Sequence, residues 1–293
     1  MRATKGSRHA VAVVFALGCL LAPRVGQAEE IRLIIRADDV GMTEGSLEAV
    51  ERGLNEGVVS ATSVLVPGPW FEGAAALCRR NPGWCTGVHL CLVGEWQGYR
   101  WRPVLPWDRV ASLVDEDGFL YGSPGELFAH EPKLAEIEAE LRAQVALAKK
   151  HGVNVQYVDT HYMTTKEYPG LEDVVMRIAA DNHVPFSTHA GEKRFASIEQ
   201  LPVEQKMAQA LKQVEALEPG LWLWFCHPGI DSPEQRALVH TAREDIFLGG
   251  GVGAHRAEIL RIMTSLDLRS ALLKKGVVLT NYRELQMRES PGQ

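Results

Sequence analysis

The 293-residue chain has an ordinary globular composition, with 46% hydrophobic and 23% charged residues, and a formal net charge of −6. Binding to a phosphate backbone requires a basic surface, so this charge argues against nucleic acid as a partner. The length suits one large domain with a single sizeable core.

The first 28 residues differ in character from the rest of the chain. Basic residues at 2, 5 and 8 precede the apolar run 10–21, and small residues lead up to Ala28. This order is typical of a secretory signal peptide, so we expect cleavage after Ala28 and export of residues 29–293 to the periplasm or the medium. Lipid attachment at Cys19 is the alternative, which the apolar Leu20 and Leu21 disfavour.

Loss of residues 1–28 removes four basic residues and leaves 27 basic against 37 acidic ones, a net charge of −10. The apolar run 10–21 is short for a membrane span, and no later stretch approaches ~18 apolar residues. We therefore do not expect an integral membrane protein.

From residue 31 onward, short apolar runs alternate with longer helical patterns. The predicted strands are 31–37, 58–66, 85–92, 153–158, 184–189, 220–226 and 276–280. The predicted helices are 44–56, 70–80, 132–151, 170–182, 200–217, 233–242 and 255–275. About seven strands alternating with helices predict one α/β domain whose parallel strands form a (β/α) barrel-like sheet, with an open doubly wound sheet as the alternative.

Residues 95–132 interrupt this alternation. The segment contains many aromatic residues among prolines and glycines, including Trp96, Tyr99, Trp101, Trp107, Phe119 and Tyr121. Aromatic side chains can stack on the apolar faces of sugars, so we interpret this long segment as a functional loop.

The chain after residue 28 contains four cysteines and no CxxC pair, which argues against a zinc ribbon or a thioredoxin motif. Cys78 and Cys85 bracket a turn-like segment and could form a disulfide in an exported protein. Four unpaired or buried thiols are an equally good alternative.

Four predicted strands carry a carboxylate or an imidazole at the same end. These residues are Asp38, Asp39, His89, Asp159, His161 and His227. Each has an ordinary explanation by itself, as a helix cap, a core histidine, a surface pair or a turn residue. Because the carboxyl ends of parallel strands meet at one edge, where ligands bind, their joint placement favours a functional site.

The residue types at this edge suggest metal-assisted hydrolysis. Two imidazoles and one carboxylate can bind a divalent ion such as Zn²⁺, Mg²⁺ or Mn²⁺ and leave positions open for water and substrate. A second carboxylate can take a proton from the water, and another imidazole can protonate a leaving amine. The spacing alone does not decide which of Asp38 and Asp39 has which role.

The ordered motifs resemble those of the YdjC/ChbG-like carbohydrate deacetylases. They are Ala37–Gly41, Gly57–Ser63, Gly87–Leu90, Asp159–His161 and His227–Gly229. The resemblance implies a barrel-like (β/α) fold and the removal of an N-acetyl group from an amino sugar, by attack of metal-activated water on the acetamide carbonyl.

The same resemblance implies individual roles. Asp39, His89 and His161 would bind one divalent metal ion, Asp38 would be the general base and His227 the general acid. The family usually has a second histidine where this chain has Met163, and this departure bears on substrate contacts or metal affinity.

Two other functions stay open from the sequence. A metal site of this kind could hydrolyse a phosphoester or a glycosidic bond, and an exported glycan-binding protein could have lost its activity. His189, Lys193 and Arg194 follow a predicted strand and either contact the substrate or belong to a solvated loop.

Overall fold

The computed structural model describes residues 30–241, 247 and 250–289, without the side chains of residues 163, 164 and 289. The predicted signal peptide and Cys19 lie outside this part of the chain, and so does the Met163 side chain. Among the described helices, none combines the length and apolar character that crossing a membrane requires.

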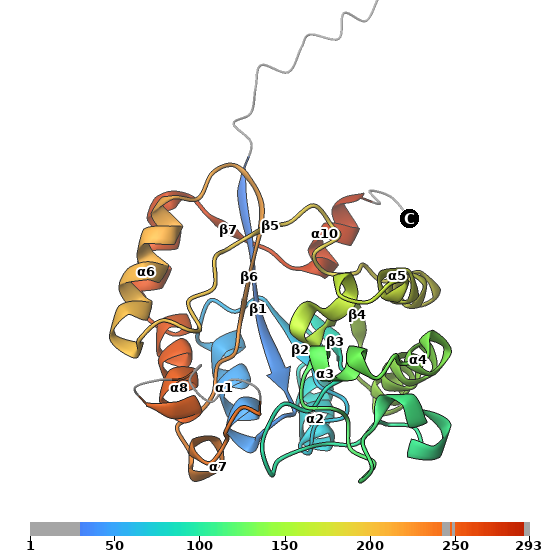
Figure 1. The fold of residues 1–293 in the computed structure, drawn as a ribbon. Coiled ribbons are helices and arrows are strands. Elements are labelled where there is room, and N and C mark those ends of the chain that lie inside the picture. Colours follow the sequence, from blue (N-terminus) through green and yellow to red (C-terminus); the bar gives the residue numbers. More distant parts are fainter. Residues whose placement is uncertain (1–29, 242–246, 248–249, 290–293) are drawn as a thin grey trace, which may run out of the picture.

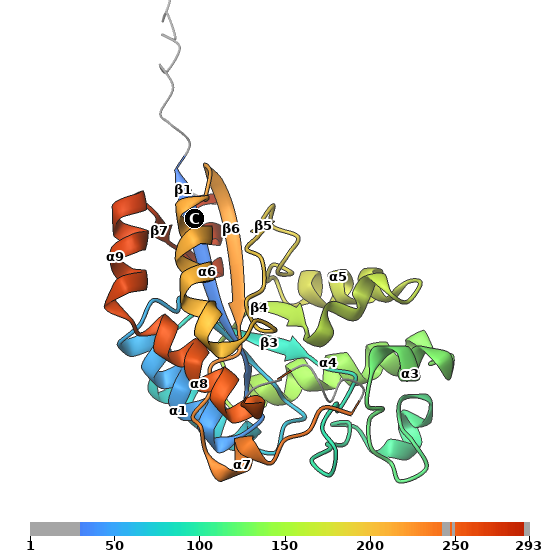
Figure 2. The ribbon, with the colours of Figure 1, turned by 60° about the vertical axis from the view of Figure 1, so that its left-hand side comes forward.

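One curled parallel sheet forms the centre of the domain, with the order β4-β3-β2-β1-β6-β5 and with β7 beside β1. The strands are β1 (Ile31–Val40), β2 (Ala61–Val64), β3 (Thr86–Leu90), β4 (Val155–Thr160), β5 (Lys193–Arg194), β6 (Gly220–Cys226) and β7 (Val278–Leu279). The sheet curls into a half-barrel surrounded by helices (Figures 1 and 2). This confirms the predicted single α/β domain with a barrel-like parallel sheet.

Helices cover the outside of the half-barrel. They are α1 (Glu44–Asn55), α2 (Phe71–Arg80), α3 (Pro124–Ala129), α4 (Leu134–Lys150), α5 (Leu171–Asp181), α6 (Val203–Glu215), α7 (Pro233–Arg236), α8 (Gly251–Met263), α9 (Leu266–Lys275) and α10 (Tyr282–Glu289). The described residues also form the short 3₁₀ helices η1 (Trp107–Arg109), η2 (Ala111–Leu113) and η3 (His161–Lys166). Figure 1 shows α6 and α8 on one side of β1 and β6, and α4 and α5 on the side of β4.

Helix α1 illustrates how local sequence fixes an element. The Thr43 side chain accepts a hydrogen bond from the backbone N–H of Ser46, and the Ser46 side chain accepts one from the backbone N–H of Thr43. This reciprocal cap satisfies N–H groups that have no partner inside the helix. The helix therefore begins directly after the end of β1, next to Asp39.

Three predicted elements differ in the structure. Ser265 caps a new helix by accepting from the N–H of Leu268, which splits the predicted helix 255–275 into α8 and α9. The predicted strand 184–189 reduces to a bridge at Phe186, since the positive φ of 74° at Thr188 turns the chain away. The predicted helix 233–242 ends at Arg236.

Part of the aromatic segment belongs to the core. Trp96, Trp101 and Tyr121 are buried, and the Trp101 indole N–H donates to the carbonyl of Val93. Trp107 is 58% exposed. Trp101 and Tyr121 therefore fill space beneath the irregular chain and offer no stacking surface, whereas Trp96 lines a cavity. The interpretation of the segment as a functional loop stays a prediction.

All four cysteines in the described part of the chain are buried free thiols. Cys78 lies in α2 and packs in the main core, whereas Cys85 packs in a second cluster with Tyr157 and Tyr282. Burial raises the pKa of the Cys78 thiol to about 12 and that of Cys85 to about 11. The predicted alternative of a Cys78–Cys85 disulfide is wrong.

Candidate active site

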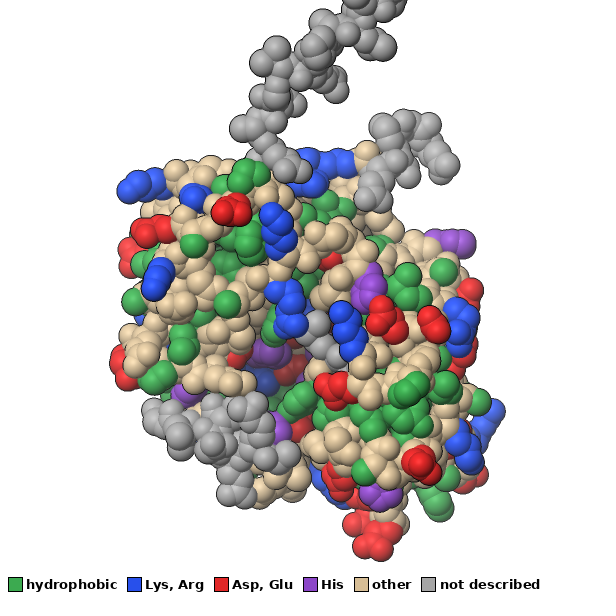
Figure 3. Space-filling view, turned by 45° about the horizontal axis from the view of Figure 1, so that its top comes forward, with side chains coloured by type: hydrophobic (Ala, Val, Ile, Leu, Met, Phe, Trp, Pro, Cys, Tyr) green, Lys and Arg blue, Asp and Glu red, His purple; other side chains and the backbone are tan. Residues whose placement is uncertain are grey.

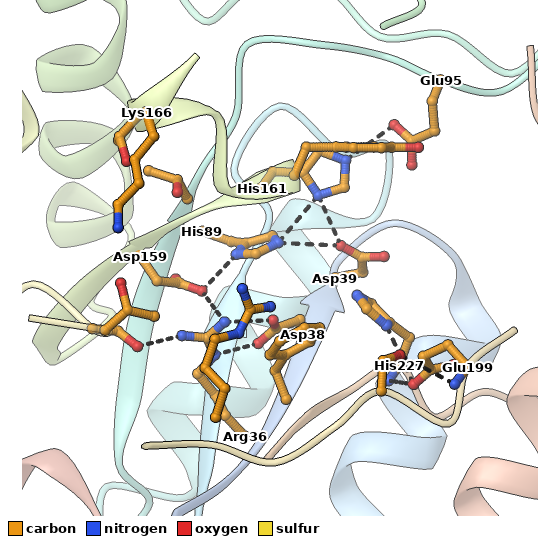
Figure 4. Close-up of a pocket in the computed structure, with 18 of the residues that line it drawn as sticks. Arg36, Asp38, Asp39, His89, Glu95, Asp159, His161, Lys166, Glu199 and His227 are labelled. Atoms are coloured by element: carbon orange, nitrogen blue, oxygen red, sulfur yellow. Dashed lines mark hydrogen bonds and ion pairs between the residues drawn. The ribbon is translucent and has the colours of Figure 1, made fainter. Parts of the chain in front are cut away.

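The carboxyl ends of β1, β3 and β4 bring Asp39, His89 and His161 together, all buried (Figure 4). Asp39 Oδ1 lies 3.4 Å from His89 Nε2 and 3.3 Å from His161 Nδ1. The two imidazole nitrogens are 3.1 Å apart. The predicted metal-binding residues thus converge on one point.

The backbone at the end of β1 explains how two adjacent aspartates both face this site. Asp39 has a φ of 61°, and the β1–β2 register shifts between Ala37 and Val40. Adjacent side chains on a regular strand point to opposite faces, so a residue in the left-handed region is needed to redirect one of them. Such strain in a non-glycine residue persists only where the surroundings enforce it.

Each histidine is held from behind by a second carboxylate. His89 Nδ1 lies 2.9 Å from Asp159 Oδ2, and His161 Nε2 lies 3.1 Å from Glu95 Oε2. A carboxylate can only accept, so these nitrogens carry the ring N–H groups. In the neutral imidazoles, His89 Nε2 and His161 Nδ1 then turn lone pairs toward Asp39.

This arrangement fits a divalent cation. Asp39 Oδ1 is buried and has no hydrogen-bond partner among the described residues, and it faces two imidazole lone pairs. Three acceptors that converge without a donor need a positive charge between them. Two imidazoles and one carboxylate, each histidine backed by an acceptor, are the donor set of catalytic zinc and related ions.

The pKa values show the same need for positive charge. Burial lowers the pKa of His89, but the charges of Asp159 and Asp38 outweigh it and raise the value to about 9. Burial raises the pKa of Asp39, but the charges of His227 and His161 outweigh it and hold the value well below the ordinary range. Protons on the imidazoles and a metal ion are therefore competing ways to balance these carboxylates.

Asp38 lies beside the cluster and is bound by Arg36. The guanidinium donates through Nε to Oδ1 at 2.6 Å and through Nη2 to Oδ2 at 2.7 Å. Arg36 and Asp38 are two residues apart on β1 and share a face. The same guanidinium reaches Asp159 Oδ2 at 2.8 Å and Ser187 Oγ at 2.5 Å, so one cation holds the predicted base and the carboxylate behind His89.

His227 follows β6 on the other side of β1 and points toward Asp39 in Figure 4. Its side chain is 23% exposed, its Nδ1 lies 3.4 Å from Glu199 Oε1, and its backbone N–H donates to the same oxygen at 3.1 Å. Burial lowers the pKa of His227, but the charge of Asp39 and the hydrogen bond with Glu199 raise it overall.

These side chains form part of the wall of a cavity of about 780 Å³, large enough for a sugar. All five predicted site residues line it. Figure 3 shows the hollow, with histidine, acidic and basic side chains at its floor. The five residues therefore share one open site.

Comparison with known proteins identifies the family of the chain. Residues 32–274 match the family described as YdjC-like protein. The chain belongs to this YdjC-like family. The carbohydrate deacetylase of Enterococcus faecalis is 26% identical over 275 residues, which cover 87% of this chain and 98% of that protein. The carbohydrate deacetylase of Thermus thermophilus is 30% identical over 243 residues, covering 74% and 85%.

A solved structure supports the fold of this YdjC-like chain. A crystal structure from Enterococcus faecalis V583, named for cellobiose-phosphate cleavage, superimposes with a TM-score of 0.69 at 24% identity. The match covers 87% of this chain and 99% of the other. The half-barrel is thus an experimentally observed architecture.

The YdjC-like site also contains residues that the sequence reasoning missed. Arg36 could have been suspected, because a charged residue inside an apolar strand needs a buried partner. Glu95 follows the apolar run after β3, and a charged residue at such a position also needs a buried partner. Glu199 comes from the loop before α6, and Arg256, which donates to Asp39 Oδ2 at 2.9 Å, comes from α8. Neither Glu199 nor Arg256 follows the end of a predicted strand, so the pattern that predicts the other site residues does not include them.

Proposed function

We propose that this protein is a metal-dependent hydrolase that removes an N-acetyl group from an amino sugar or oligosaccharide. The convergence of Asp39 Oδ1, His89 Nε2 and His161 Nδ1 carries the proposal. Asp38 and His227 flank that point, as a base and an acid on either side of a scissile amide would. Relatives named carbohydrate deacetylase support the substrate class.

Asp39, His89 and His161 would hold the ion, and Asp159 and Glu95 would fix the two ring orientations. A divalent ion there, Zn²⁺, Mg²⁺ or Mn²⁺, supplies Lewis acidity toward a carbonyl oxygen and toward water. This division leaves Asp38 outside the ligand set, ready for proton transfer.

Asp38 accepts the proton of the attacking water. Both of its oxygens already accept from Arg36, yet each keeps a further lone pair, and the bidentate contact fixes the plane of the carboxylate. His227 gives a proton to the leaving nitrogen, and Glu199 holds that imidazole in place. The products are acetate and the free amine.

The test is acetate release by residues 29–293 loaded with each of the three metals. N-acetylglucosamine, chitooligosaccharides and peptidoglycan fragments are suitable substrates, with a phosphoester and an aryl glycoside as competitors. Asp38→Asn should keep the metal and lose turnover by roughly a thousandfold or more. Metal-loaded protein that releases acetate from none of them contradicts the proposal, and a binding protein would retain ligand affinity unchanged in Asp38→Asn.

We propose further that the protein is exported. The basic start, the apolar run 10–21 and the small residues before Ala28 support this proposal. Expression of the full chain in a bacterium, followed by fractionation and N-terminal sequencing, should give a periplasmic or extracellular protein that begins at Glu29. A lipid-modified Cys19 at the N-terminus, or an intact cytoplasmic chain, contradicts it.

A further inference from the structure

We propose that one edge of the active-site cavity, formed by Arg194 and Lys166, binds a carboxylate group of the substrate. We call these two residues the cationic edge. The inference deepens the proposed function, on which it rests for the identity of the N-acetylated sugar. It assigns the substrate to acidic glycans.

Arg194 and Lys166 differ from the other basic residues that line the cavity. Arg36 is bound to Asp38 and Asp159, and Arg256 is bound to Asp39. Within the described part of the chain, neither Arg194 nor Lys166 takes part in an ion pair. The pKa of Glu172 is lowered by its hydrogen bond with His189 and also by the charge of Lys166, which forms no ion pair with it. The donors of Lys166 and Arg194 are therefore both available to a ligand.

The carboxylates on the same wall are mostly engaged elsewhere. Glu192 accepts from the backbone N–H groups of Thr188 and Ala190, and Glu199 accepts from His227. Glu172 holds His189 at 2.8 Å. This leaves Glu167, an exposed carboxylate directly after Lys166, as the remaining acidic residue of this wall.

Arg194 is oriented for a planar anion. Its guanidinium carbon lies 5.2 Å from the centre of the Phe225 ring, and both residues line the cavity. A guanidinium that stacks on an aromatic face keeps its N–H edge free, and that edge matches the two oxygens of a carboxylate. The neighbouring Lys193 instead lies against the Trp222 ring and donates to the carbonyl of Pro219.

Lys166 comes from a different element, at the end of η3, and Figure 4 shows its side chain extending into the pocket on the side of Asp159. In Figure 3, basic side chains gather at one edge of the hollow, above its histidine-containing floor. The chain as a whole carries a net charge of −6. The positive charge of these two residues is therefore opposite in sign to the net charge of the protein.

The charge balance favours a carboxylate over a phosphate. The two cations are offset by Glu167 and by Glu192, whose hydrogen bonds from backbone N–H groups leave its negative charge in place. This wall therefore suits a ligand with one negative charge better than a dianion. A phosphomonoester carries about −1.5 to −2 at neutral pH and would stay under-compensated. The ligand class is therefore an N-acetylated sugar that bears a carboxylate.

The test measures binding, so that it does not depend on turnover. Metal-loaded Asp38→Asn protein is titrated calorimetrically with a disaccharide of N-acetylglucosamine and N-acetylmuramic acid, with neutral diacetylchitobiose, and with N-acetylglucosamine 6-phosphate. We expect the carboxylate sugar to bind about tenfold more tightly than the neutral one, because one charge-assisted contact in a solvated site gives an effect of this size. The preference should shrink in 0.5 M salt.

Arg194→Ala, added to that protein, should remove the preference and leave the affinity for the neutral sugar unchanged. Lys193→Ala is the matched control, since it removes an adjacent cation that does not line the cavity, and it should keep the preference. Arg194→Glu should reverse the preference, so that the neutral sugar binds more tightly than the carboxylate sugar. Equal binding of acidic and neutral sugars, stronger binding of the phosphate, or equal effects of the Arg194 and Lys193 variants would overturn the inference.

Failure of the proposed function gives a different result. If wild-type protein releases no acetate while the carboxylate preference depends on Arg194, the deacetylase proposal fails and the cationic edge stands. If acetate release is equal for acidic and neutral sugars and insensitive to Arg194→Ala, the deacetylase proposal stands and the cationic edge fails.

Discussion

The floor of the cavity and its cationic edge are built differently. On the floor, His89 and His161 are buried and each is held by a carboxylate behind it, and Asp38 is held at both oxygens by Arg36. On the edge, Arg194 and Lys166 are exposed. A fixed group suits proton transfer and metal binding, which tolerate little misplacement. An exposed charged side chain can favour one substrate over another through its charge, although it is not packed in the core.

This difference predicts the largest effect for a change on the floor. His161→Ala removes one of the proposed metal ligands and leaves Asp39 and Glu95 with unbalanced charge. We expect metal affinity, measured by competition with a chromophoric chelator, to fall on the order of a thousandfold, because binding free energy is spread over few ligands. His189→Ala, which changes an exposed histidine of the same cavity, should bind metal normally. Equal affinities in the two variants would show that His161 is not a ligand.

Arg36→Lys changes a floor residue that contacts Asp38 and Asp159 but is not a proposed metal ligand. An ammonium keeps the charge but cannot donate to both oxygens of Asp38 in one plane and also reach Asp159. We expect kcat for acetate release to fall about a hundredfold through misplacement of Asp38, the proposed base, with KM and metal content nearly unchanged. Arg32→Lys, on the same strand and outside the cavity lining, is the control. A loss confined to metal content would assign Arg36 to the metal site instead.

The sequence predicted the residues of the cavity floor better than the residues that hold them in place, and the reason is physical. Residues such as Asp39 and His89 follow apolar runs, and parallel strands end at a common edge, so chain order alone brings them together. Glu199 and Arg256 reach the site from a loop and a helix, and their positions depend on how α6 and α8 pack on the sheet. The half-barrel was predictable from alternating runs, whereas the break at Ser265 and the burial of Trp101 depend on tertiary packing.

Glu199→Gln should have an intermediate effect, visible mainly as a pH shift. His227, the proposed acid, must be protonated to act, and Glu199 helps to raise its pKa. Removal of the Glu199 charge lowers the pKa of His227, so His227 loses its proton at a lower pH. The alkaline limb of the kcat–pH profile therefore shifts to lower pH. We expect kcat at the optimum to fall by about three- to tenfold. An alkaline limb that stays in place would contradict the assignment of His227 as the acid.

The smallest effect is expected for Trp107→Ala. Trp107 lies in η1 and is 58% exposed, and it is absent from the described residues that line the cavity. Loss of an exposed ring should change the free energy of unfolding by less than about 0.5 kcal/mol and leave KM for oligosaccharides unchanged. Trp96→Ala is the contrasting variant, because Trp96 lines the cavity and is 2% exposed, so stability and activity should both fall. A rise in KM for Trp107→Ala that grows with the length of the oligosaccharide would restore the aromatic segment as a sugar-binding surface and extend the substrate site beyond the cavity.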